Sequence, residues 1–147
     1  MEKNLSRFVD VQNSAYAGYA AALDEFKRFG RKSGHWIWYI FPQLEHEFPG
    51  RSSNNQDYGI QGLEEAYAYM ADEILCSRLL EISSVVLALE GNDPEYVMGS
   101  RIDAKKLRSC MTLFSVVAPE HDVFAAVLEK YFGGRRCDWT LAAIEQV

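Results

Sequence analysis

The segment that organises this chain, residues 31–44, reads Arg-Lys-Ser-Gly-His-Trp-Ile-Trp-Tyr-Ile-Phe-Pro-Gln-Leu. Two tryptophans, a tyrosine and a phenylalanine stand close to Arg31, Lys32 and His35. Burying one large apolar side chain stabilises a fold by about 1.5–3 kcal/mol, so we expect this aromatic surface to lie inside the protein. The polar neighbours must then find partners in the interior or face a pocket.

The composition of the chain predicts one globular domain over residues 1–147. Apolar residues make up 48% of the sequence and charged residues 24%, as in ordinary globular proteins. A chain of about 150 residues buries enough surface to be stable without a disulfide or a metal.

Charge and cysteine usage exclude several classes of protein. The net charge of −6 argues against a nucleic-acid binder, whose domain is usually basic. No long apolar run or secretory leader is present, so we expect no membrane association. Cys76, Cys110 and Cys137 lack zinc-ligand spacing, which predicts reduced thiols in a cytoplasmic protein without a metal or other cofactor.

Helical periodicity runs through most of the chain. Its clearest stripe comprises Leu75, Leu79, Ile82, Val86 and Leu89. The helices that we expect are residues 5–29, a short one ending at residue 39, residues 63–70, one from 72 to about 90, a short one from 94, one from 103 to 117, residues 122–131, and a last one from 138. The sequence therefore predicts an all-α fold, an irregular or orthogonal bundle of about seven or eight helices.

Two segments are harder to assign. Trp, Ile and Tyr in residues 33–39 also favour a strand, but no other segment offers a strand partner. We therefore interpret this segment as a short buried helix that Pro42 ends. Residues 44–59 carry turn-type clusters and read as a loop.

The strongest candidate site is the group Lys32, His35 and Trp36. In one interpretation His35 is an acid or base in a pocket walled by Trp36 and Trp38, and Lys32 or Arg31 attracts an anion. In the other, His35 is a buried histidine bonded to the main chain among core aromatics. The spacing alone favours this second interpretation.

Other polar residues extend the candidate site. Gln43 and Tyr58 lie at the two ends of the expected loop, near a plausible pocket mouth. Arg78 interrupts the apolar stripe, where an arginine pairs with a carboxylate or binds an anion, and we favour the pair.

The segment 103–114 offers a second group of polar residues. Lys106 and Ser109 share a helical face and would suit a nucleophile and its base. Asp103 and Lys106 would equally form an intrahelical ion pair, which is the interpretation that the spacing favours.

Four stretches together resemble one bacterial family of unknown function. They are residues 30–44, residues 58–60 before the 63–66 helix start, residues 75–80, and residues 103–114. The family carries the serial label eighteen-ten among domains of unknown function, and its members are sometimes mislabelled calpastatin. The resemblance implies an all-helical, single-domain cytoplasmic protein and no particular activity. The family's polar pattern maps onto Lys32, His35, Trp36, Gln43, Tyr58, Arg78, Asp103 and Lys106, whereas Cys110 stands where the family usually has serine.

These observations predict a protein that binds a small, planar, anionic, nucleotide-like ligand. Trp36, Trp38 and Tyr58 would contact its plane, and Lys32 and Arg78 its acidic group. Catalysis, with His35 as acid or base, would be metal-free hydrolysis or group transfer. The alternative is a non-catalytic protein-interaction module whose aromatic stretch is core. A nucleic-acid role, through the short basic runs 105–108 and 133–136, ranks third.

Overall fold

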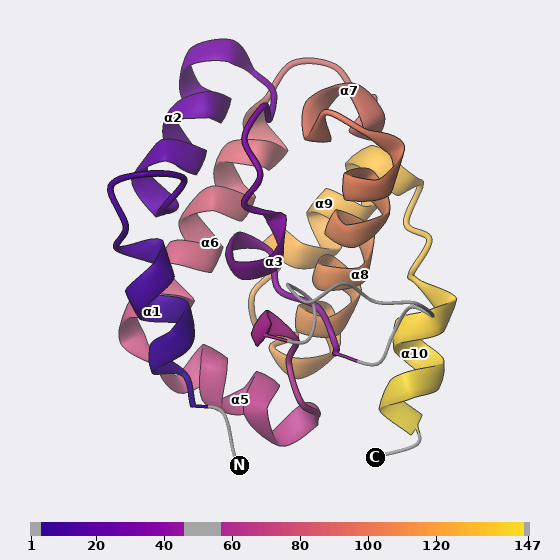
Figure 1. The fold of residues 1–147 in the computed structure, drawn as a ribbon. Coiled ribbons are helices and arrows are strands. Elements are labelled where there is room, and N and C mark those ends of the chain that lie inside the picture. The colour runs from indigo at the N-terminus through magenta and orange to yellow at the C-terminus, as the bar shows by residue number, and fades with distance from the viewer. Residues whose placement is uncertain (1–3, 46–56, 146–147) are drawn as a thin grey trace.

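The computed structural model describes residues 4–45 and 57–145. Within these two ranges the chain forms nine helices and no strand, which confirms the predicted all-α bundle (Figure 1). The helices are α1 (Ser6–Gln12), α2 (Tyr19–Phe29), α3 (Ile37–Ile40), α5 (Leu63–Ala71), α6 (Glu73–Ala88), α7 (Pro94–Met98), α8 (Arg101–Val117), α9 (Val123–Phe132) and α10 (Asp138–Glu145).

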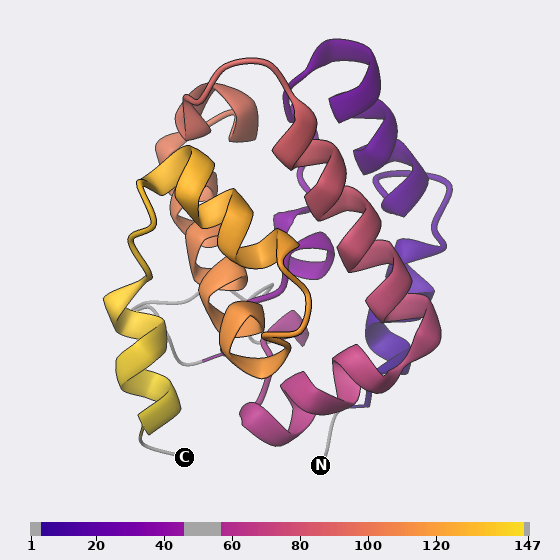
Figure 2. The ribbon, with the colours of Figure 1, turned by 180° about the vertical axis from the view of Figure 1, so that it is seen from behind.

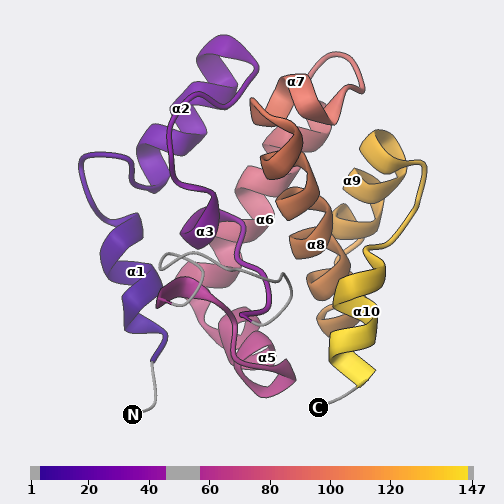
Figure 3. The same ribbon diagram turned by 45° about the vertical axis from the view of Figure 1, so that its right-hand side comes forward.

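The long helices α6, α8 and α9 form the centre of the bundle. Helix α9 packs against both α8 and α6, as the view from behind shows (Figure 2). Helices α1 and α2 pack on the outer side of α6, and α10 packs on α8 at the opposite side (Figure 3). The short helix α3 and the segment before it lie between these two halves. The segment 31–44 therefore occupies the middle of the fold.

The core is built from aromatic rings contributed by the whole chain. Trp36 and Phe41, from the central segment, pack against Phe26 of α2 with ring centroids 5.5 and 6.5 Å away. All three rings are buried, as is Phe114 of α8. The expectation that the aromatic segment lies inside is confirmed, because its rings join a core that several helices share.

The prediction of one helix over residues 5–29 is wrong, because helix α1 ends at Gln12 and α2 starts at Tyr19. A Cβ at Gly18 would lie 2.0 Å from the main-chain oxygen of Ser14, so the chain passes itself too closely for a side chain. Ala17 has a φ of 55°, which is strained for a residue with a side chain. This turn buries Gln12, whose amide donates to the Tyr39 carbonyl at 2.8 Å.

Helix α8 also begins earlier than predicted. Its cap is Ser100, whose hydroxyl accepts the Asp103 N–H at 3.0 Å, and its first residue is Arg101. Asp103 therefore lies in the first turn of α8, whereas the sequence placed the start of the helix at residue 103 itself. Because a serine supplies the cap, the Asp103 carboxylate is available for a tertiary contact.

The central segment forms a short helix, as predicted. Helix α3 covers Ile37–Ile40, and its first residues lie later than the suggested start at residues 33–34. The following residues pair with a distant segment, since Leu44 forms an isolated parallel bridge with Ile60. Most of the expected 44–59 loop, residues 46–56, lies outside the described residues.

None of the helices in the described part of the chain is long and apolar enough to cross a membrane.

Helix capping gives a matched test of this fold. Asp72 accepts the N–H groups of Ile74 and Leu75 at the start of α6, whereas Asp122 at the start of α9 makes no side-chain cap bond. We expect Asp72→Ala to lower the free energy of unfolding by about 1 kcal/mol, because two main-chain donors lose their acceptor. The control Asp122→Ala should cost clearly less. Urea unfolding of both variants measures the difference, and equal losses would contradict the assigned caps.

Candidate functional site

The loop between α2 and α3 is held by one carboxylate. A single oxygen of Glu25, Oε1, accepts the N–H groups of Ser33 at 2.7 Å, Gly34 at 2.8 Å and the Trp36 indole at 3.1 Å. A Cβ at Gly34 would lie 2.7 Å from the other oxygen of Glu25 and 2.9 Å from the Trp36 ring, so a larger residue here would displace one of these side chains. Burial alone would raise the pKa of the Glu25 carboxyl, but these donors and the Lys32 ammonium hold it below its ordinary value.

Lys32 extends from this loop into the interior. Its ammonium forms an ion pair with Asp103 Oδ2 at 2.7 Å, donates to the Gly34 carbonyl, and lies 4.8 Å from the centre of the Trp36 ring. Its side chain is 4% exposed and that of Asp103 is 17% exposed. The main chain of Lys32 is also fixed, because its N–H donates to the Val97 carbonyl at 2.7 Å. A buried ion pair therefore joins the loop to α8.

A second lysine approaches the same carboxylate. Lys106 Nζ lies 4.0 Å from Asp103 Oδ1 and 4.9 Å from the centre of the Trp38 ring. Burial lowers the pKa of the Lys106 ammonium, Asp103 opposes this shift, and Lys32 adds to it. Two ammonium groups thus share the Asp103 carboxylate, and Glu25 is a second carboxylate that interacts with Lys32.

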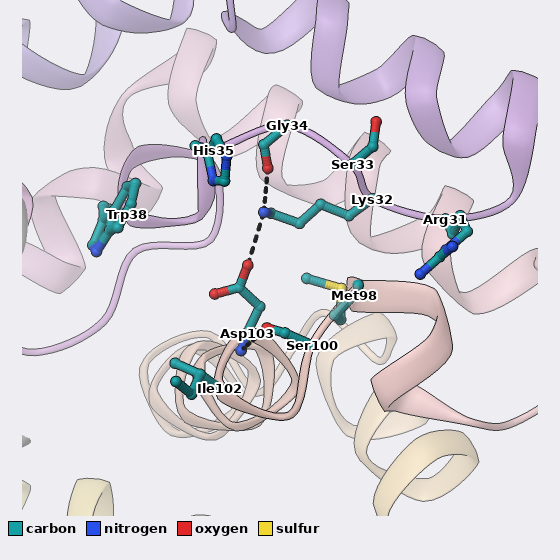
Figure 4. A pocket seen from close by; sticks show the side chains of 11 residues that line it. Arg31, Lys32, Ser33, Gly34, His35, Trp38, Met98, Ser100, Ile102 and Asp103 are labelled. Carbon is teal, nitrogen blue, oxygen red and sulfur yellow. Dashed lines mark hydrogen bonds and ion pairs between the residues drawn. The ribbon is translucent and has the colours of Figure 1, made fainter.

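These groups lie at a pocket of about 410 Å³ between the loop, α3 and the start of α8 (Figure 4). The Lys32 side chain runs below the loop, with its nitrogen between Gly34 above and Asp103 below, and His35 and Trp38 lie beyond that nitrogen. His35 is exposed to solvent, and its ring belongs to the pocket lining. The full lining comprises Arg31, Lys32, Ser33, Gly34, His35, Trp38, Met98, Gly99, Ser100, Ile102 and Asp103.

The first turn of α8 forms one wall of the pocket. The N-terminus of a helix carries a partial positive charge, which favours anions. Arg31 adds a further cation to the pocket lining. Its guanidinium lies 4.7 Å from the Tyr96 ring centre and donates to the Tyr96 carbonyl. Ile102, which is 65% exposed, supplies apolar surface, and the fully buried Met98 lies beneath the pocket floor. The pocket is therefore basic along its length and apolar on one side.

The structure brings together five of the residues that the sequence singled out. Lys32, His35, Trp38 and Asp103 line the pocket, and Lys106 contacts two of these residues. Trp36 is fully buried behind Lys32, so it supports the ammonium from the core and is not a wall of the pocket.

Gln43 and Tyr58 are placed away from the pocket lining. Gln43 is buried, its carbonyl accepts the Ile60 N–H at 2.8 Å, and its side-chain Nε2 has no hydrogen-bond partner in the described part of the chain. Tyr58 packs with its ring centre 5.2 Å from Tyr39 and 6.3 Å from Phe8. Both residues belong to the interior beyond α3, because the 43–45 segment folds inward to meet Ile60.

Arg78 also lies elsewhere, at the turn between α1 and α2. Its guanidinium donates to the side-chain oxygens of Gln12 at 3.2 Å and Asn13 at 2.7 Å, and it lies 5.5 Å from the Tyr19 ring centre. These contacts replace the carboxylate partner that the sequence favoured. Arg78 braces the α1–α2 turn and is not brought to the pocket.

The nucleophile–base pair of Ser109 and Lys106 gains no support from the structure. Ser109 is fully buried, and its hydroxyl lies 3.1 Å from the Thr140 hydroxyl of α10. Lys106 instead extends towards Asp103 and Trp38. Among the described residues, no group of three or more His, Cys, Asp or Glu side chains is arranged to hold a metal ion.

Sequence reasoning missed Glu25, Met98, Ser100 and Ile102. The spacing Ser100-x-x-Asp103 is a helix-start signal and would have placed the N-terminus of α8 correctly. No local signal identifies Glu25, because its role depends on the path of the loop that follows α2.

Comparisons with known proteins agree with this fold. A family model described as a protein of unknown function, DUF1810, matches residues 2–144. The crystal structure of the conserved hypothetical protein Rv1873 from Mycobacterium tuberculosis is 39% identical and superposes with a TM-score of 0.87, covering 96% of each chain. A search of curated proteins finds no match.

The Glu25 clamp predicts a pH-dependent stability. Because the folded state lowers the pKa of Glu25, the carboxylate stabilises the fold above its unfolded pKa, and this contribution is lost as pH falls through the folded value. We expect Glu25→Gln to be less stable than wild type at pH 7, with a difference that shrinks in acid. Urea unfolding at several pH values measures this.

The matched control for Glu25 is the exposed Glu120, for which Glu120→Gln should leave stability nearly unchanged at each pH. A Glu25→Gln deficit that grows as pH falls would contradict the clamp.

Proposed function

This chain belongs to the DUF1810 family of proteins of unknown function, and for this member we propose the binding of a small, planar, anionic ligand in the Lys32 pocket. The pocket's volume of about 410 Å³ lies within the common range for small-molecule sites, roughly 300–1,000 Å³. A nucleotide or a sugar phosphate has the required charge and size.

The observation that carries this proposal is the sharing of Asp103 by two ammonium groups. Lys32 takes one carboxylate oxygen at 2.7 Å, and Lys106 lies 4.0 Å from the other. Together with Arg31 of the lining, Lys32 and Lys106 give three cations against the carboxylates of Asp103 and Glu25, and an incoming anion would balance this local excess of positive charge. The chain as a whole has a net charge of −6, so the positive charge at this pocket is opposite in sign to the net charge of the protein.

Planarity follows from the walls of the pocket. The Trp38 ring lines it, and a flat ligand would stack on an indole face. Ile102 would contact the apolar edge of the ligand. Trp38 therefore takes the stacking role that the sequence interpretation divided among Trp36, Trp38 and Tyr58.

The position of His35 favours ligand binding over a purely structural role for the segment. An interaction module with an aromatic core predicts a buried His35 bonded to the main chain, whereas His35 is exposed and lines the pocket. We propose His35 as the acid or base of a metal-free hydrolysis or group transfer on the bound anion. We also propose a cytoplasmic location, because the three cysteines of the sequence are few and widely spaced, as in proteins that do not depend on disulfides.

Removal of the surplus charge tests ligand binding. We expect Lys106→Gln to weaken binding of ADP or ribose 5-phosphate by about tenfold, about 1.4 kcal/mol, while leaving the Lys32–Asp103 pair intact. Calorimetry at low salt, after a thermal-shift screen of nucleotides and sugar phosphates, measures the affinity. The neighbouring Lys105 is exposed, so Lys105→Gln is the matched control. No stabilising compound for wild type, or equal losses in both variants, would refute the proposal.

Replacement of His35 separates catalysis from binding. Because the side chain is exposed, His35→Ala should change the free energy of unfolding by less than about 0.5 kcal/mol. Phosphorus NMR would follow turnover of each compound that binds, and the variant should be slower by about 10²-fold or more if His35 transfers a proton. Turnover at the wild-type rate would exclude His35 as the acid or base.

A further inference from the structure

We propose that Lys106 is a nucleophilic amine that forms an imine with an aldehyde or keto group of an anion bound in the Lys32 pocket. The inference rests on the proposed function, because the pocket must first hold the anion. It names a substrate class, a carbonyl compound that also carries a phosphate or carboxylate group.

The position of Lys106 distinguishes it from Lys105, the other lysine of α8. Its side chain is 18% exposed, and its nitrogen is held between the Trp38 ring and Asp103 Oδ1. Lys105, the preceding residue, is exposed. Lys106 is not itself part of the pocket lining, but both of its contacts are with lining residues, so its nitrogen lies next to the wall formed by Trp38 and Asp103.

The charges around Lys106 favour reactivity near neutral pH. Burial and the Lys32 ammonium lower the pKa of Lys106, and a lysine beside a second cation is a recognised form of activated amine. The Asp103 carboxylate and the Trp38 face favour the charged form of Lys106, and they hold its nitrogen in place. Asp103 already forms an ion pair with Lys32 at 2.7 Å, so it raises the pKa of Lys106 less than an unshared carboxylate would.

The chemistry uses only groups of the pocket. The neutral nitrogen of Lys106 forms a bond to the carbonyl carbon, and the carbonyl electron pair moves to oxygen, which takes up a proton. The nitrogen releases one proton to Asp103 Oδ1, 4.0 Å away, which passes it to the new hydroxyl. The nitrogen electron pair then forms the C=N bond as the C–O bond breaks and water leaves. Loss of the remaining proton from nitrogen, which replaces the one first taken up by oxygen, gives the imine. One amine and one carbonyl thus give one imine and one water. Lys32 stabilises the negative charge that develops on oxygen.

Pyridoxal 5′-phosphate is a suitable probe, because it is a planar anionic aldehyde. We expect the full-length protein to form an imine with it at pH 7, visible in the absorption spectrum. Borohydride reduction followed by peptide mass spectrometry should place most of the label on Lys106. At pH 11, exposed lysines should become labelled as well, since an ordinary lysine amine is then mostly neutral.

Three comparisons make the result decisive. Lys106→Arg keeps the positive charge and should lose the label, whereas Lys105→Arg should keep it. Circular dichroism establishes that both variants are folded. Pyridoxine 5′-phosphate, which has an alcohol in place of the aldehyde, should bind without labelling.

The outcomes separate the two proposals. Binding of pyridoxine 5′-phosphate with label spread over surface lysines, with label on Lys32, or with no label would overturn the role of Lys106 and leave anion binding standing. Failure of both probes and of the nucleotide panel to bind would overturn the pocket itself, and this inference with it. Label concentrated on Lys106 at pH 7 and lost in Lys106→Arg would support the imine.

Discussion

The ion pair between Lys32 and Asp103 is the contact on which the rest of the site depends. It joins the loop before α3 to the first turn of α8 at 2.7 Å, in surroundings that expose little of either side chain. A charge that is removed from water is tolerated when it is paired. Replacing either residue alone would therefore leave the other charge buried without its partner. The pair fixes the distance between the two walls of the pocket, and the Lys32 N–H bond to Val97 ties the same loop to α7.

The loop between α2 and α3, which carries Lys32, is held in place by hydrogen bonds. Glu25 accepts three N–H donors from residues 33–36, and Gly34 permits the close approach. The rigid loop places His35 in solvent while Trp36 enters the core. Two adjacent residues of this segment thus have different roles, because Trp36 is part of the core and His35 lines the pocket. A preformed site of this kind binds a ligand with little loss of conformational entropy.

The helices were predictable because helix signals are local. The apolar stripe of α6, its Asp72 cap and the Asp93–Pro94 start of α7 all lie within a few residues of the helices that they define. The prediction over residues 5–29 was wrong for the opposite reason. The break at Gly18 is favoured by the contacts of Gln12 with α3 and of Arg78 with Asn13, which no local pattern reveals.

The sequence by itself determined the all-α class, the burial of the aromatic segment and the family to which the chain belongs. It also indicated most of the polar residues at the pocket. Only the tertiary structure decided which of them meet. Lys32, His35, Trp38, Asp103 and Lys106 converge because α8 packs beneath the loop, whereas Arg78 faces the α1–α2 turn on another side of the bundle. Periodicity specifies which face of a helix is buried, but the helix that covers it is chosen by packing between distant segments.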